Sequence, residues 1–230
     1  MLKNYIKNQQ TQLLEKQSDF YTANGLHVFF KDAVPNVDVE KVIAKVESAI
    51  PNHLLSEIEM IIFGWFDEFE ERSINAFYES GTLFISNVQD DFMDMYDDLV
   101  HEISHSLEEP HGYFFYGDKK IEEEFLRKRK YLHDMLWKMG YKIPLSVFMD
   151  TEYSKELDMF LYKKVGYDKL STIVAGVFIT PYAATSLREY FATGFTEFYT
   201  YPESHNFLKK ISPQLFKKLI MLQNPEELDN

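Results

Sequence analysis

The chain has 230 residues, of which 45% are hydrophobic and 16% aromatic, so a disordered protein is excluded and one sizeable domain is expected. Its formal net charge of −13 argues against a general affinity for nucleic acid and favours basic partners or substrates. Cysteine is absent, so disulfides and thiolate metal sites are excluded. A metal ion would need histidine and carboxylate ligands.

Residues 1–25 are expected to form an N-terminal helical segment. They contain no apolar core of the length that a signal peptide needs, and no later stretch approaches the length of a membrane span. The chain is therefore expected to stay where it is made, in the cytoplasm of the producing cell, unless a phage particle or a dedicated export system delivers it.

Residues 26–230 are expected to form a single α+β domain. Its first part, 26–109, is expected to hold a small mixed sheet and one functional helix, and its second part, 110–230, to be mainly helical. Apolar runs predict strands at 26–30, 58–63, 76–78 and 81–86, and apolar spacing predicts a helix at 37–46 that ends before Pro51. For Thr82–Ser86 two positions stay open: an edge of the sheet, where an extended peptide could pair with it, or the interior.

An HExxH motif at 101–105 is the strongest functional signal in the chain. On a helix, His101 and His105 point in nearly the same direction, about 40° apart, so both imidazoles can bind one metal ion. Glu102 points about 100° away from His101, where a carboxylate can act as general base on a water bound to that metal. Apolar neighbours predict that this helix is buried on one side. The acidic residues at 90–98 are interpreted as capping its N-terminus.

A catalytic zinc site needs a third protein ligand, and His111 is the first candidate. It follows His101 by ten residues, which is the spacing found in metzincins. Metzincins carry a glycine where this chain has Glu108, but Pro110 could still end the helix.

Glu189 is the second candidate for the third ligand. It lies in an apolar, aromatic stretch that is expected to be a buried helix with Ser186 or Thr185 as its N-cap. A carboxylate in such a helix needs a partner, and either a metal ion or a salt bridge with Arg188 would supply one.

The segment between the candidate ligands carries no motif. Residues 119–139 have helical spacing and many charges, which predicts a surface helix, and residues 155–164 are also expected to be helical. No function is assigned to 119–172.

Three blocks of sequence resemble one family of peptidases. They are the stretch 101–109 with Gly112-Tyr113 after it, the stretch 188–195 (REYFATGF), and, more weakly, Ser212–Phe216. They are similar to corresponding stretches of the zinc peptidases built like the catalytic domain of anthrax lethal factor, which include the clostridial Pro-Pro endopeptidases. The resemblance covers roughly residues 26–222, apart from 119–172.

This resemblance implies a zincin-like fold of the gluzincin type with one zinc ion per chain. It implies His101, His105 and Glu189 as zinc ligands and Glu102 as general base. Tyr182, seven residues before Glu189, matches a family tyrosine that stabilises the oxyanion. Thr193 departs from lethal factor, which has a glutamate there, so the contacts behind the ligands differ.

The expected function is therefore that of a zinc-dependent endopeptidase acting on a protein or peptide, with basic targets favoured by the acidity of the chain. Two alternatives stay open: a catalytically silent zincin that serves as an interaction or virion component, and a metzincin-like peptidase that uses His111.

Overall fold

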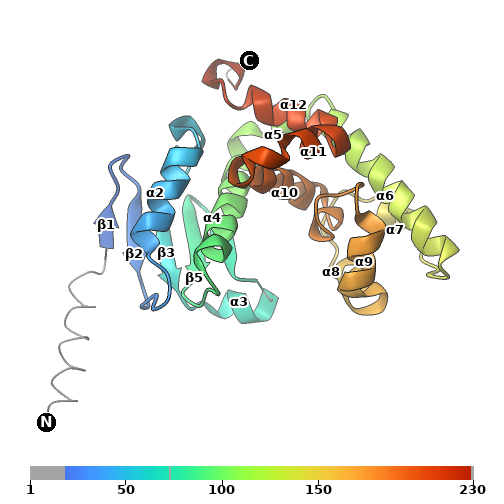
Figure 1. Cartoon of the computed structure of the whole chain (residues 1–230), viewed down its shortest axis with the longest axis horizontal. Helices are drawn as coiled ribbons and strands as arrows, with labels where there is room; N and C mark the ends of the chain where they lie inside the picture. The colour runs from blue at the N-terminus through green and yellow to red at the C-terminus, as the bar shows by residue number, and fades with distance from the viewer. Residues whose placement is uncertain (1–18, 73, 229–230) are drawn as a thin grey trace, which may run out of the picture. The chain divides into compact units, whose positions relative to one another are not determined.

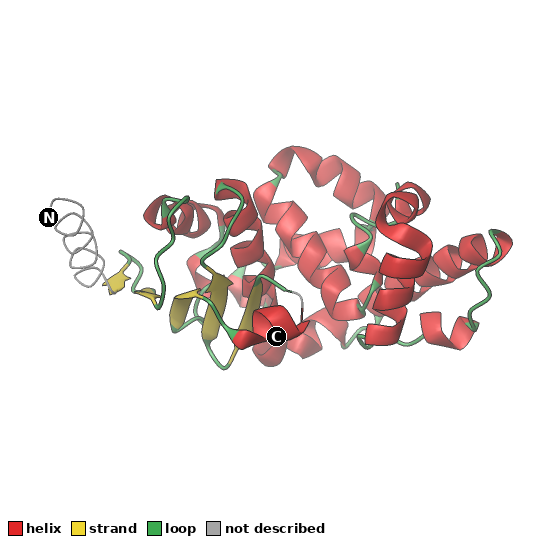
Figure 2. Cartoon of the chain, turned by 90° about the horizontal axis from the view of Figure 1, so that it is seen from below, coloured by secondary structure: helices red, strands yellow, loops and turns green. Residues whose placement is uncertain are grey.

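A computed structural model of the chain describes residues 19–72 and 74–228. The chain divides into two compact units, a sheet unit (Met1–Ser106) and a helical unit (Leu107–Asn230). The named strands all belong to the sheet unit, as Figure 2 shows, so the predicted α+β class is confirmed. The division lies close to the one expected after residue 109.

The sheet unit begins differently from the prediction. Residues 1–18 of the expected helical segment lie outside the described residues, and Asp19–Tyr21 form a strand instead of a helix. The elements of this unit are β1 (Asp19–Tyr21), β2 (His27–Phe30), α2 (Val39–Ala49), η1 (Asn52–Leu54), β3 (Met60–Gly64), α3 (Asp67–Arg72), β4 (Ala76–Glu79), β5 (Thr82–Ser86) and α4 (Phe92–Ser106). All four predicted strands are confirmed.

The five strands form one mixed sheet in the order β1-β2-β3-β5-β4. The two inner pairings, β2 with β3 and β3 with β5, are parallel, and the two outer pairings are antiparallel. β5 therefore lies inside the sheet, and the interpretation of Thr82–Ser86 as an edge strand is wrong. The edge next to β5 is β4, which no other described strand covers.

Register decides which backbone groups of β4 face outward. The backbone N–H of Ser86 donates to the carbonyl of Asn75 at 2.8 Å, and the pairing then continues as Ala76 with Ile85. Because hydrogen-bonded and non-hydrogen-bonded pairs alternate in an antiparallel ladder, the N–H and C=O groups of Ala76 and Tyr78 point away from β5. No other described strand pairs with them.

The two faces of the sheet have different partners. One face is covered by α2 and α4 (Figure 1), and the strand residues that point to it are fully buried: Val28, Ile61, Phe63, Leu83 and Ile85. The other face carries an aromatic cluster in which Phe77 stacks on Phe84 with ring centroids 4.6 Å apart, and Phe66 contacts Phe84 edge-on at 5.0 Å. α4 packs against β4 and β5, so the motif helix is held beside the sheet edge.

The helical unit is built around α10, which packs against α6, α11 and α12. Its elements are α5 (Glu108–Tyr116), α6 (Lys120–Lys138), α7 (Leu145–Phe148), α8 (Lys155–Met159), the π-helical segment η2 (Phe160–Gly166), α9 (Tyr167–Val174), η3 (Tyr182–Ala184), α10 (Leu187–Thr200), η4 (Pro202–Ser204), α11 (His205–Ile211), α12 (Pro213–Met221) and η5 (Pro225–Glu227). α6 forms where predicted and exposes one side, with Arg127, Lys130 and Lys138 among its exposed residues, but its other side is not purely apolar. It buries charged side chains, among them Glu124, Lys128 and Arg129.

Gly194 allows α10 to approach α12 closely. A Cβ atom at this position would lie 2.2 Å from Cδ2 of Leu215, a fully buried side chain. Gly194→Ala should therefore destabilise the protein by about 1–3 kcal/mol in urea unfolding, because the buried Leu215 side chain must leave its position or the two helices must separate. Gly112→Ala is the matched control, since a Cβ there meets no atom within 4 Å and alanine favours the helix. Equal stability of the two variants would contradict this close packing.

Candidate metal site

The motif helix α4 is fixed at its start and along its buried side. The Asp91 carboxylate accepts hydrogen bonds from the backbone N–H groups of Met93 at 2.7 Å and Asp94 at 3.0 Å. This is N-terminal capping, as the acidic cluster predicted. Leu99 and Ile103 are fully buried, so the apolar side of the helix packs into the core and its polar side faces away from the core.

His101, Glu102 and His105 form a group that could hold a metal ion. Their candidate ligand atoms all lie within 4.8 Å of one another, and the two imidazole rings lie with centroids 5.0 Å apart and planes at 77°. Imidazole nitrogens about 2.1 Å from a tetrahedral zinc ion are about 3.4 Å apart, so small side-chain rotations bring them to that spacing. The donors present therefore fit zinc.

The three side chains of this group are partly shielded from solvent. Both histidines are half-buried, and Glu102 is only 9% exposed. A carboxylate in such a place is costly to leave charged without a cation or hydrogen-bond donors. The group therefore combines two imidazoles and a carboxylate in a place with little solvent.

Asp98 adds a second carboxyl group next to the motif. Burial raises its pKa to about 7, and the charges of Asp94 and Glu102 raise it further, whereas a hydrogen bond from Gln89 Nε2 at 3.2 Å and the charge of His101 oppose the rise. Asp98 therefore belongs to the electrostatic environment of the motif. The sequence interpretation assigned this residue to capping alone and missed that role.

Glu189, the predicted third ligand, lies in the first turn of α10 and is half-buried. Its backbone N–H donates to Ser186 Oγ at 3.1 Å, so the expected N-cap is confirmed at Ser186. The neighbouring Arg188 donates from Nε to Glu108 Oε2 at 2.7 Å, and the Tyr116 hydroxyl donates to Oε1 of the same carboxylate at 2.6 Å. Arg188 thus has a carboxylate partner other than Glu189.

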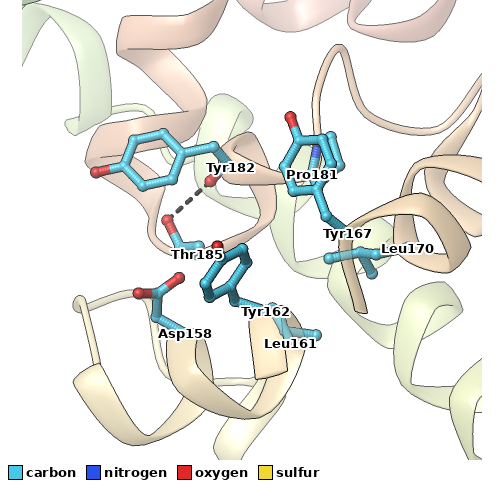
Figure 3. Close-up of a pocket in the computed structure, with 8 residues that line it drawn as sticks. All are labelled: Asp158, Leu161, Tyr162, Tyr167, Leu170, Pro181, Tyr182 and Thr185. Carbon is cyan, nitrogen blue, oxygen red and sulfur yellow. Dashed lines mark hydrogen bonds between the residues drawn. The ribbon is translucent and has the colours of Figure 1, made fainter. Parts of the chain in front are cut away.

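Tyr182 is the first residue of the short η3 turn, directly before α10. Its side chain is 39% exposed, and its carbonyl accepts a hydrogen bond from the Thr185 hydroxyl at 2.8 Å (Figure 3). The turn therefore holds a phenol at the surface of the helical unit, where a ligand can reach it.

His111 lies inside α5, and the chain there is helical. Its backbone N–H donates to the carbonyl of Leu107 at 3.0 Å, and Pro110 occupies the first turn of α5, where proline is tolerated. The expected helix end at Pro110 is therefore wrong. The motif helix α4 itself ends at Ser106, and His111 lies in the next helix, α5.

Arg129 is a residue that the sequence interpretation missed. It is fully buried in α6, and its guanidinium donates to four backbone carbonyls: Ala184 and Thr185 at 3.1 Å each, Phe148 at 3.1 Å and Val147 at 2.9 Å. Two of these carbonyls belong to the turn between Tyr182 and α10. Arg129 therefore anchors the segment that carries both Tyr182 and the start of the Glu189 helix.

Within the described residues, no helix has the length and apolar character needed to cross a bilayer. Comparison of the chain with protein-family models, with curated proteins and with solved structures found no match. Function is therefore inferred from the side chains and their geometry.

Proposed function

We propose that the protein is a zinc-dependent endopeptidase with a zincin-like catalytic domain. One observation carries the proposal: the ligand atoms of His101, Glu102 and His105 gather within 4.8 Å on a buried helix that packs against the edge strand β4. This combination would provide a metal site and a strand edge for an extended peptide in the same unit.

His101, His105 and Glu189 would hold the zinc ion, with Glu189 as the third ligand that the resemblance implies. Bound zinc would polarise the scissile carbonyl and lower the pKa of the attacking water. Glu102 would accept the proton of that water and pass it to the leaving amine. Tyr182 would donate a hydrogen bond from its hydroxyl to the oxyanion that develops on the carbonyl oxygen.

The free edge of β4 offers a way to hold the peptide. The outward N–H and C=O groups of Ala76 and Tyr78 can pair with an extended backbone, so binding would need few side-chain contacts. The substrate would thus pair with β4 and not with Thr82–Ser86, which lies inside the sheet.

Zinc content per chain tests the ligand set. Purified wild type should hold one zinc ion, Glu189→Ala should lose most of it, and His111→Ala should keep it, because losing one of three ligands weakens a catalytic site severely. Circular dichroism of each variant controls for folding.

Each other outcome has a distinct meaning. Loss of zinc only in His111→Ala would establish the metzincin-like ligand set instead. A wild-type protein without zinc would reject the proposed function. A zinc-loaded protein that cleaves nothing in a broad peptide library would favour the silent, interaction-type zincin.

A further inference from the structure

A pocket opens on the surface of the helical unit, beside Tyr182 (Figure 3). It is lined by Asp158, Leu161, Tyr162, Tyr167, Leu170, Pro181, Tyr182 and Thr185. Three of these are tyrosines with substantial exposure: 52% for Tyr162, 52% for Tyr167 and 39% for Tyr182. Exposed aromatic rings gathered around one hollow are typical of a binding site.

Most of the pocket surface is apolar, and Asp158 is its one acidic residue. Leu161 and Leu170 are buried at 1% and 2% exposure, and Figure 3 shows the carboxylate of Asp158 near Tyr162 and Thr185. The Tyr153 hydroxyl donates to Asp158 Oδ2 at 3.1 Å. No lysine, arginine or histidine of the described residues forms an ion pair with Asp158, so its charge remains available to a ligand.

These features favour a long cationic side chain over other ligands. The methylene groups of lysine or arginine can lie along the leucines and tyrosine rings while the charged head reaches the carboxylate. A purely apolar side chain would cover Asp158 without compensating its charge, and an acidic one would be repelled.

We infer that this pocket binds a lysine or arginine side chain of the peptide substrate. The inference deepens the proposed function and rests on it, because Tyr182 both lines the pocket and is the proposed oxyanion donor. A basic residue held here would belong to the part of the substrate close to the scissile bond. The net charge of −13 would also attract basic peptides over a longer range.

Binding of small amides to the full chain tests the pocket without requiring cleavage. We would titrate Nα-acetyl-lysine methylamide and, as an uncharged match, Nα-acetyl-norleucine methylamide, and follow the ring signals of ¹³C-labelled tyrosine by NMR. Tyr162→Phe and Tyr167→Phe identify the relevant signals. The lysine amide should shift both signals saturably and bind about fivefold more tightly than the norleucine amide.

Asp158→Asn should remove most of that preference, whereas Asp168→Asn, the same charge change at an exposed position outside the pocket, should not. Equal binding of the two amides, absence of shifts at these tyrosines, or an unchanged preference in Asp158→Asn would overturn the inference. Failure of the peptidase proposal is distinguishable, because a protein without zinc or cleavage can still show lysine-selective binding, and an active peptidase can lack it.

Discussion

Glu102→Gln should reduce peptide cleavage by about 10²–10⁴-fold while one zinc ion per chain stays bound. Glutamine has the shape of glutamate but cannot accept the proton of the attacking water, so only the chemical step is lost. The measurement combines cleavage of a broad peptide library with metal analysis of the same samples. His101 and His105 are unchanged in this variant, so their hold on the metal should persist.

The matched control is Glu109→Gln, an exposed position close to the motif with the same change of charge. It should cleave like the wild type. A Glu102→Gln protein that still cuts peptides at the wild-type rate would reject Glu102 as general base. Loss of zinc from that variant would instead show that Glu102 is a metal ligand. This outcome is worth testing, because the Glu102 carboxylate lies close to both histidines.

Local signals in the sequence were sufficient for many of the elements. Strand positions followed from short apolar runs, and the starts of α4 and α10 followed from Asp91 and Ser186, whose side chains accept backbone hydrogen bonds within the next three residues. Such features depend on a few neighbouring residues, so a single sequence contains them. The grouping of His101, Glu102 and His105 is also local, because one helix sets it.

Features that depend on distant pairing could not be predicted in the same way. Strand order placed β5 inside the sheet and β4 at its edge, although both strands looked alike as sequences. The charged spacing of α6 suggested a solvated surface, but three of its charged residues are buried against other elements. Glu124, for example, accepts hydrogen bonds from the Tyr190 hydroxyl at 2.9 Å and the backbone of Gln214 at 2.9 Å. Only the tertiary structure supplies these partners.

Arg129→Met should destabilise the protein by about 3 kcal/mol or more, because it leaves buried backbone carbonyls without donors. Methionine fills a similar volume, so the loss should come from hydrogen bonding more than from a cavity. Urea unfolding measures the change. Arg127→Met, an exposed position two residues earlier in α6, is the matched control and should stay close to the wild type. Equal midpoints for the two variants would contradict the anchoring role.

Arg129→Lys extends the argument from stability to function, because lysine keeps the charge but cannot reach four carbonyls at once. If this variant folds, the turn that carries Tyr182 should be held less firmly, and kcat should fall several-fold with little change in KM, since the hydroxyl acts on the developing oxyanion. The double variant Arg129→Lys/Tyr182→Phe should then lower kcat by less than the product of the two single reductions, because both substitutions act through the same hydroxyl. Fully additive effects on kcat would show that Arg129 supports the fold but does not position Tyr182.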